Sequence, residues 1–196
     1  MNLLLARTTA LLSLALLFSL AMADSKPEPS LAKVVSYVAE VFRVREMMTQ
    51  ATVQQSAGDP KFQAAMKAAF ADIFINDLAA RLAVPLSESL TPAEATPCLE
   101  FIESDDGAAF LAVAKQAETT KLLGEAVLEM PQPQRRRTRE FFDSRCFKTV
   151  VSFLGSKESL DISQRYGLEV VCYFIKRTDP KMANVSKKAR EDCSKL

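Results

Sequence analysis

Apolar residues recur at three- and four-residue steps along most of this chain, which is the spacing of one face of an α-helix. The first stripe follows Ser30, a candidate N-cap, and stops at residues 58–60 (Gly-Asp-Pro), because glycine ends helices and proline cannot continue them. A second stripe runs from Phe62 to Leu82, and Pro85 ends or bends that helix. No segment alternates apolar and polar residues between hairpin turns. The pattern predicts an all-α fold, a single-domain antiparallel helical bundle of about six helices.

The clearest helix start is at Thr91. This threonine suits the N-cap, a proline follows at the first helical position, and Glu94 occupies the third position of a capping box. Because Thr96-Pro97 repeats the start signal, the helix either kinks at Pro97 or begins there. The polar break from Ser104 to Gly107 then offers caps for another helix, which continues to about Met130.

The last third of the chain predicts three more helices. The connector Pro131-Gln132-Pro133 precedes a helix that opens at Arg135 and ends near the turn at Gly155. A further helix spans Leu160 to Ile175, and a short helix held by Cys193 closes the chain. The helical domain is therefore expected to cover residues 30–196.

The first 23 residues have the pattern of a cleaved secretory signal peptide. Arg7 gives a positive start, residues 8–20 are mainly apolar, and Ala21-Met22-Ala23 is a small-x-small site with cleavage expected after Ala23. Residues 24–29 form a polar, proline-containing leader that we expect to be mobile. The apolar run is too short and wrongly flanked for a membrane span of about 20 residues. We expect a water-soluble periplasmic or secreted protein with no transmembrane segment in the mature chain.

The composition narrows the chemistry that the chain can perform. Histidine is absent, which excludes Ser-His-Asp and Cys-His catalysis and zinc sites that use histidine. The formal net charge is only +1, whereas nucleic-acid-binding domains are usually strongly basic, so no nucleic acid is expected as a partner. No GxGxxG or P-loop pattern occurs. We assign no catalytic, cofactor-binding or metal-binding residue.

Four cysteines remain in the expected mature chain: Cys98, Cys146, Cys172 and Cys193. An even number in an exported chain favours disulfide bonds. No CxxC pair occurs, so a thioredoxin-like redox motif is poorly supported. We expect two structural bridges, with buried free thiols as the alternative. Four cysteines allow three pairings, and their spacing does not select one.

The segment over residues 70–116 contains a short motif. The motif reads Leu90-Thr91-Pro92-Ala93-Glu94, then Phe101-Ile102-Glu103-Ser104, then Gly107 and Phe110. It resembles the core of a family of exported bacterial helical proteins known as domain of unknown function 2059. The chain departs from that family's pattern at Ile102, where a second aromatic residue would stand, and by carrying Pro97. The resemblance implies a helical fold and export, and it implies no reaction.

Four arginines cluster at the start of the helix after the proline connector: Arg135, Arg136, Arg137 and Arg139. Because cations at a helix N-terminus oppose the helix dipole, the cluster is a candidate for peripheral contact with an anionic envelope surface. The alternative is a solvated face in which Arg136 pairs with Glu140 and Arg139 pairs with Asp143. We favour the solvated face, since exposed charge runs usually serve solvation.

An acidic patch surrounds the polar break: Glu100, Glu103, Asp105 and Asp106. Two carboxylates can act as the acid and base of a glycoside hydrolase without histidine. They can also hold a hard cation, but the spacing matches no calcium loop. We favour ordinary capping chemistry at helix ends. Carboxylates that face each other inside a cleft would support the enzyme instead.

The leading interpretation is an exported, periplasmic helical protein without enzymatic activity that binds a partner protein or a small apolar ligand. It rests on the signal-like segment, the amphipathic helices and the missing catalytic residue types. The alternatives are a carboxylate-dependent hydrolase of the cell envelope and an anionic-surface binder that uses the arginines at 135–139.

Overall fold

We describe the protein from a computed structural model, which covers residues 28–55, 64, 67–69, 75–117, 119–180 and 187–195. Several sequence predictions lie outside these residues. They are the signal peptide with its cleavage after Ala23, most of the leader at 24–29, the helix stop at 58–60, and most of the stripe that precedes Ile75.

The described residues form helices and no strands, which confirms the all-α fold. The helices are α2 (Pro29–Val41), α3 (Val44–Gln55), α5 (Ile75–Leu86), α6 (Pro92–Ile102), α7 (Asp105–Gln116), α8 (Thr120–Glu129), α9 (Gln132–Asp143), α10 (Arg145–Leu154), α11 (Lys157–Thr178) and α12 (Lys187–Ser194). The predicted number of about six was too low, because the described part of the chain alone contains ten.

Short polar interruptions account for the additional helices. The first predicted helix divides at Arg43, whose φ of 52° ends α2 in the left-handed region. Ser144 divides the helix predicted after Arg135: its hydroxyl accepts from the Phe147 amide and donates to the Phe141 carbonyl. Thr119 caps α8 in a similar way. The three- and four-residue spacing of apolar residues continues across each break, so the sequence pattern alone does not reveal where one helix ends and the next begins.

The start of α2 corrects one prediction. The helix begins at Pro29, with Glu28 as its N-cap, so residues 28 and 29 belong to the folded part and not to a leader. Ser30 is not the cap. Its side chain lies inside the first turn and donates a hydrogen bond of 3.0 Å to the Glu28 carboxylate. Proline at the first helical position explains the earlier start, because its φ already suits a helix.

The capping box at Thr91 forms as predicted. The Thr91 hydroxyl accepts from the Glu94 amide at 3.3 Å, and the Glu94 carboxylate accepts from the Thr91 amide at 3.0 Å. Hydrogen bonds from Thr91 are the main cause of the lowered pKa of Glu94. The Arg145 guanidinium, 3.1 Å from the Glu94 carboxylate, also lowers this pKa. The helix therefore begins at Pro92, and Pro97 lies inside it.

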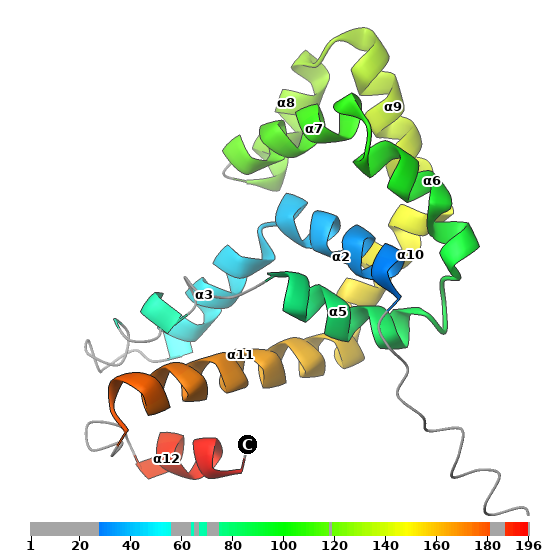
Figure 1. Cartoon of the computed structure of the whole chain (residues 1–196). Coiled ribbons are helices and arrows are strands. Elements are labelled where there is room, and N and C mark those ends of the chain that lie inside the picture. The colour runs from blue at the N-terminus through cyan, green and yellow to red at the C-terminus, as the bar shows by residue number, and fades with distance from the viewer. Residues whose placement is uncertain are drawn as a thin grey trace, which may run out of the picture.

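Helix α2 lies at the centre of the fold. Figure 1 shows it between α5 on one side and α7 on the other, with α6 and α10 crossing near its beginning. One face of α2 is completely buried through Leu31, Val34, Val35 and Val38. Leu78 and Leu82 of α5 are also buried in this core. Burial of each such side chain contributes roughly 1.5–3 kcal/mol of hydrophobic free energy.

Aromatic rings connect α2 to the later helices. Phe101 of α6 stacks on Phe141 of α9, with 4.3 Å between ring centroids. Tyr37 of α2 meets Phe141 edge-on at 6.0 Å. Phe110 of α7 meets Phe142 of α9 edge-on at 5.2 Å. Offset-stacked and edge-on rings are the favoured geometries for aromatic pairs, so this cluster fixes α6, α7 and α9 around α2.

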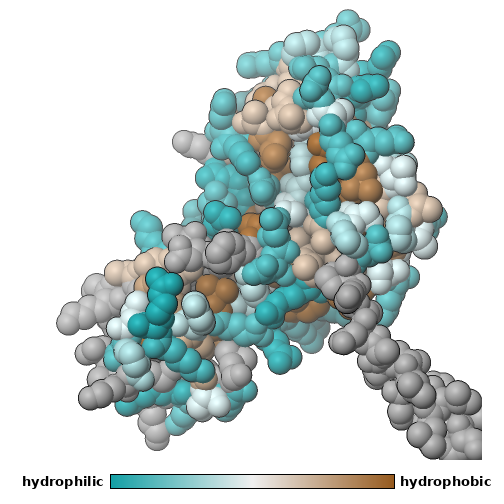
Figure 2. Space-filling view, viewed as in Figure 1, coloured by the Kyte–Doolittle hydropathy of each residue, from teal (hydrophilic) through white to brown (hydrophobic). Residues whose placement is uncertain are grey.

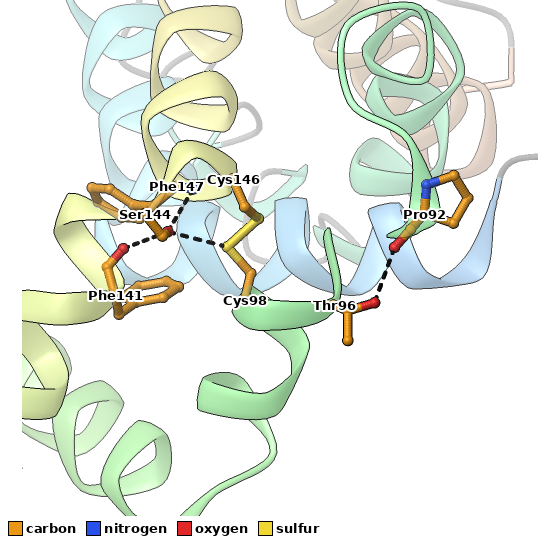
Figure 3. Close-up of a disulfide and its surroundings, with 7 residues drawn as sticks. All are labelled: Pro92, Thr96, Cys98, Phe141, Ser144, Cys146 and Phe147. Atoms are coloured by element: carbon orange, nitrogen blue, oxygen red, sulfur yellow. Dashed lines mark hydrogen bonds between the residues drawn. A yellow bond between two sulfur atoms is a disulfide. The ribbon is translucent and has the colours of Figure 1, made fainter. Parts of the chain in front are cut away.

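All four cysteines are paired. Cys98 of α6 bonds to Cys146 of α10, and Cys172 of α11 bonds to Cys193 of α12, with Cα–Cα distances of 6.2 and 5.3 Å. Both distances lie in the usual range for disulfide bonds. The structure confirms the two expected bridges and selects one of the three possible pairings. Figure 3 shows the first bridge beside Ser144, whose hydroxyl lies 3.8 Å from the Cys98 sulfur.

Candidate functional site

A surface groove of about 450 Å³ lies along one side of α2. Its α2 wall is formed by Pro29, Ala32, Lys33, Ser36, Tyr37 and Glu40, and its other walls by Asn76, Ile102 and Leu111. The groove is open to solvent on one side. On the face of the molecule in Figure 2, hydrophobic surface is visible in patches between polar side chains.

The helical period of α2 creates the groove. Residues 29, 33, 36 and 40 are separated by three or four positions and share one face. This face lies next to the buried stripe, so small and polar side chains stand there in place of large apolar ones. Ile102 at the end of α6 and Leu111 of α7 then supply apolar surface from the opposite wall. The groove is the space that these two walls leave between them.

Two charged groove residues on α2 form ion pairs with side chains of α7 and of the C-cap of α6. Lys33 contacts Glu103, the C-cap of α6, with 2.7 Å between Nζ and Oε1. Glu40 contacts Lys115 of α7, with 2.8 Å between Oε2 and Nζ. All four side chains are 37–58% exposed. Exposed pairs contribute only about 0–1 kcal/mol each, so a ligand can replace them at small cost.

Tyr37 forms part of the groove wall and anchors it to the core. Its hydroxyl donates a hydrogen bond of 2.7 Å to the Gly107 carbonyl at the start of α7, and its side chain is 6% exposed. Burial raises the pKa of the Tyr37 hydroxyl well above its ordinary value of 10.0, so the side chain stays neutral. Tyr37 therefore provides a neutral structural contact between α2 and the start of α7.

Gly107 allows α6 and α7 to approach each other closely. A Cβ atom at this position would collide with the Phe101 carbonyl oxygen. The Gly107 amide donates to the Ser104 hydroxyl at 3.2 Å, so Ser104 caps α7 as predicted. The turn places Ile102 at the groove and Glu103 in contact with Lys33. Positions 101–110 of the sequence motif thus have a physical role in building one groove wall.

A second, smaller pocket of about 230 Å³ lies where α2 meets α3 and where α7 ends. Phe42, Leu123 and the half-exposed Met47 supply its apolar lining. The Arg43 guanidinium donates to the Ala117 carbonyl at 3.2 Å and lies 3.6 Å from the Glu46 carboxylate. These contacts join the end of α7 to the turn between α2 and α3. The pocket is therefore the space left where these helices meet.

Three of the four arginines of the cluster have contacts within the structure. Arg135 donates to the Leu128 carbonyl at 2.6 Å, and Arg137 contacts Asp106 of α7 at 3.4 Å. The predicted pair of Arg136 with Glu140 is present at 3.8 Å. The predicted pair of Arg139 with Asp143 is absent from the described residues, because Asp143 contacts Lys148 at 3.3 Å instead.

The four acidic residues at the polar break do not face one another in a cleft. Glu103 contacts Lys33 and Asp106 contacts Arg137, while Glu100 and Asp105 are exposed. None of the four lines either pocket. Within the described ranges, no three acidic or cysteine side chains gather in a group that could hold a metal ion. The contacts of Glu103 and Asp106 are exposed ion pairs at helix ends, as expected for ordinary capping chemistry.

Comparison with known proteins gives no match. No family model, no curated protein and no solved structure is similar to this chain at a significant level. The resemblance to domain of unknown function 2059 therefore stays a prediction. In the part of the chain that the structure describes, every helix is too short or too polar to cross a membrane.

Sequence reasoning missed the groove residues on α2. Their signal is present, because Lys33, Ser36 and Glu40 repeat along the polar side of an otherwise apolar helix. That signal alone indicates only a solvated face. The opposite wall comes from residues about 70 positions away, so only the tertiary fold reveals the groove.

Proposed function

We propose that this protein is an exported, non-enzymatic helical module that binds a partner protein through the groove along α2. The single observation that carries the proposal is the groove itself, which combines apolar surface from Ile102 and Leu111 with polar and charged side chains of α2. Its two charged side chains already form ion pairs with neighbouring residues, and Tyr37 in its wall is neutral. Such a surface suits recognition better than acid–base chemistry.

The open shape of the groove favours a partner protein over a small apolar ligand. Pockets for small molecules usually bury 70–90% or more of the ligand surface, which requires enclosing walls. This groove is lined by α2, by Asn76 of α5 and by Ile102 and Leu111 of α6 and α7, and it stays open to solvent. A protein segment can cover an open groove with its own surface, whereas a small apolar ligand would stay largely in water.

Export is part of the proposal. The signal-like first 23 residues support it, and so do two disulfide bonds, which persist in oxidising compartments and are rare in reducing ones. The two bridges are consistent with an extracellular or otherwise oxidising location. We infer a periplasmic or secreted protein related to domain of unknown function 2059, whose motif residues here form the α6–α7 turn.

Site-specific photo-crosslinking tests the proposal. A benzophenone side chain placed at Ser36, inside the groove, should form a covalent adduct with another protein in the cells that produce this chain. The matched control is the same side chain at Ser152, an exposed serine on α10 that lies outside the groove. Protein adducts from Ser36 and none from Ser152 support partner binding. Adducts with lipid alone, or equal adducts from both positions, would contradict it.

A further inference from the structure

The two disulfide bonds differ in what must move before a reductant can reach them. All four cysteine side chains are buried, with 0–2% of each exposed. Cys98 and Cys146 lie in the hydrophobic core, so their sulfur atoms become accessible only when core helices separate. Cys172 and Cys193 lie outside that core, on α11 and α12. Because thiol–disulfide exchange requires a thiolate to reach one of the two sulfur atoms, access decides which bridge reacts.

Helix α12 is a short polar element at the edge of the fold. It has eight residues, and Figure 1 shows it beside the C-terminal half of α11. Of its side chains that the structure describes, Cys193 is buried, while Arg190, Glu191 and Ser194 are exposed. Isolated helices shorter than about 12–15 residues are marginal in water. Opening such a helix costs far less free energy than separating the core, so this bridge becomes accessible while the rest stays folded.

A cationic side chain accompanies each sulfur atom of this bridge. Lys176 follows Cys172 by four residues on α11, and Arg190 precedes Cys193 by three residues on α12. Each cation therefore lies one turn from its cysteine, on the same side of the helix. Both cations are exposed, and neither forms an ion pair with another described side chain. A nearby cation stabilises a thiolate, which makes the departing sulfur a better leaving group.

The acidic neighbours of the bridge do not offset these cations. Glu169 precedes Cys172 by three residues, and its carboxylate contacts Arg81 at 2.6 Å and Arg165 at 3.6 Å. Glu191 is two residues before the other cysteine, so it points to a different side of α12. The charge closest to the two sulfur atoms along their own helix faces is therefore positive.

The core bridge has the opposite surroundings. Figure 3 shows Phe141 and Phe147 close to it. Arg145, which directly precedes Cys146, is held by the Glu94 carboxylate at 3.1 Å. A thiolate released among apolar side chains is disfavoured, so the core bridge exchanges slowly even when a reductant reaches it.

We propose that the Cys172–Cys193 bridge is a thiol–disulfide exchange site, that its substrate is the dithiol of a CxxC oxidoreductase, and that exchange releases α12 from α11. A thiolate of the oxidoreductase attacks the Cys193 sulfur, since α12 is the element that opens. The bond between the two protein sulfur atoms breaks, and Cys172 leaves as a thiolate that takes up a proton. This site is separate from the groove and goes beyond partner binding there.

The second thiol of the oxidoreductase completes the exchange. It loses its proton to solvent and attacks the mixed disulfide, which frees Cys193 as a thiolate that is then protonated. Two electrons pass from the dithiol to the bridge. The products are two thiols on this chain and a disulfide on the oxidoreductase.

Release of α12 changes the surface of α11. Leu160, Gln164, Leu168 and Cys172 follow one another at four-residue steps, so they form one row along the helix. The two leucines are 52% and 38% exposed, whereas the cysteine is 2% exposed beside α12. Reduction therefore adds the Cys172 thiol to a row that is already open to solvent. The oxidised and reduced states share one core and differ at the C-terminal end.

Site-resolved reduction kinetics test the proposal on the full chain with both bridges formed. Reduced thioredoxin is the probe, and free thiols are alkylated at intervals and located by peptide mass mapping. Cys172 and Cys193 should become alkylated together, about 100-fold or more faster than Cys98 and Cys146, because only the core bridge requires the core to open. Amide exchange in residues 187–194 should accelerate at the same time, while α2 and α6 keep their protection.

Variants of both proteins sharpen the test. Thioredoxin without its second cysteine should be trapped as a mixed disulfide on Cys193. Lys176→Gln should slow exchange about threefold, because the leaving thiolate loses its nearby cation. The matched control is Arg177→Gln, which removes an exposed cation from the same end of α11 on a side that does not face Cys172, and it should leave the rate nearly unchanged.

Specific results would overturn the proposal. Equal rates at the two bridges, or reduction only in urea that unfolds the core, would contradict the exchange site. Reduction by dithiothreitol without reduction by thioredoxin would exclude a protein dithiol as the substrate. Trapping on Cys172 would contradict the order of attack. Reduction that leaves amide exchange in residues 187–194 unchanged would exclude the release of α12.

Discussion

The two disulfide bonds join regions of very different character. Cys98 and Cys146 belong to the continuous hydrophobic core and connect α6 to α10, which also pack directly on α2. Cys172 and Cys193 are equally buried but lie outside that core, and α12 packs mainly on α11 at the edge of the molecule (Figure 1). The first bridge thus reinforces contacts that already exist, whereas the second is a major attachment of a peripheral helix.

This comparison separates cross-linking from packing as sources of stability. Chain entropy alone assigns the two bridges similar values, because their loops of 48 and 21 residues differ little on a logarithmic scale. Packing predicts different losses of stability when each bridge is removed. Only the first bridge joins helices of the central core, which must all separate when the protein unfolds. A change in the central region should therefore cost more stability than a matched change in the C-terminal region or elsewhere outside the core.

Removing the core bridge should have the largest effect. We expect Cys98→Ala with Cys146→Ala to lower the free energy of unfolding by about 4 kcal/mol, measured by urea unfolding with circular dichroism. Cys172→Ala with Cys193→Ala should cost less than about 1 kcal/mol in the same measurement, because α12 can separate while the core stays folded. Amide exchange within residues 187–194 should then accelerate. Equal losses in the two double variants would contradict the comparison.

The close approach at Gly107 should have the next largest effect. Gly107→Ala places a Cβ atom against the Phe101 carbonyl, so the α6–α7 turn must shift and we expect a loss of about 3 kcal/mol. The control is Gly155→Ala at the end of α10, where the nearest atom to a new Cβ is 3.6 Å away. That substitution should change the free energy of unfolding by less than about 0.5 kcal/mol. A small effect at Gly107 would show that the turn is not tightly constrained.

The buried tyrosine should give a smaller, pH-dependent effect. Burial raises the pKa of Tyr37 above its ordinary value of 10.0, so the unfolded chain loses the phenol proton first. Stability should therefore fall as the pH rises above about 10. Tyr37→Phe should remove this part of the decline and cost about 1 kcal/mol at neutral pH, because the Gly107 carbonyl loses its donor.

The control for this measurement is Tyr173→Phe on α11, where the tyrosine is 67% exposed. It should leave the alkaline unfolding profile as in the unchanged chain. An alkaline decline that persists in Tyr37→Phe would mean that another group controls it.

Local chemistry made some of the fold predictable from the sequence. The caps at Thr91 and Ser104 and the helix end near Pro85 each depend on residues within a few positions, and all are present. The breaks at Arg43 and Ser144 were missed, since the apolar period continues across them. A non-glycine residue in the left-handed region has no reliable local signal.

The candidate site was not predictable for a different reason. Two walls far apart in the sequence meet at the groove, so the polar side of α2 by itself indicates only a solvated face. The disulfide pairing was not predictable for the same reason, because only the fold brings Cys98 within reach of Cys146. The arginine and acidic clusters, which were conspicuous in the sequence, are divided among contacts on different sides of their helices.

Site-resolved amide exchange with the partner protein that Ser36 captures tests the central claim most directly, because it reports on every helix in one experiment. The account predicts that this partner slows exchange in residues 29–41 of α2 and 105–116 of α7, with no change in α11 or α12. Protection confined to the C-terminal helices, or no protection along α2, would contradict the assignment of the groove as the binding site.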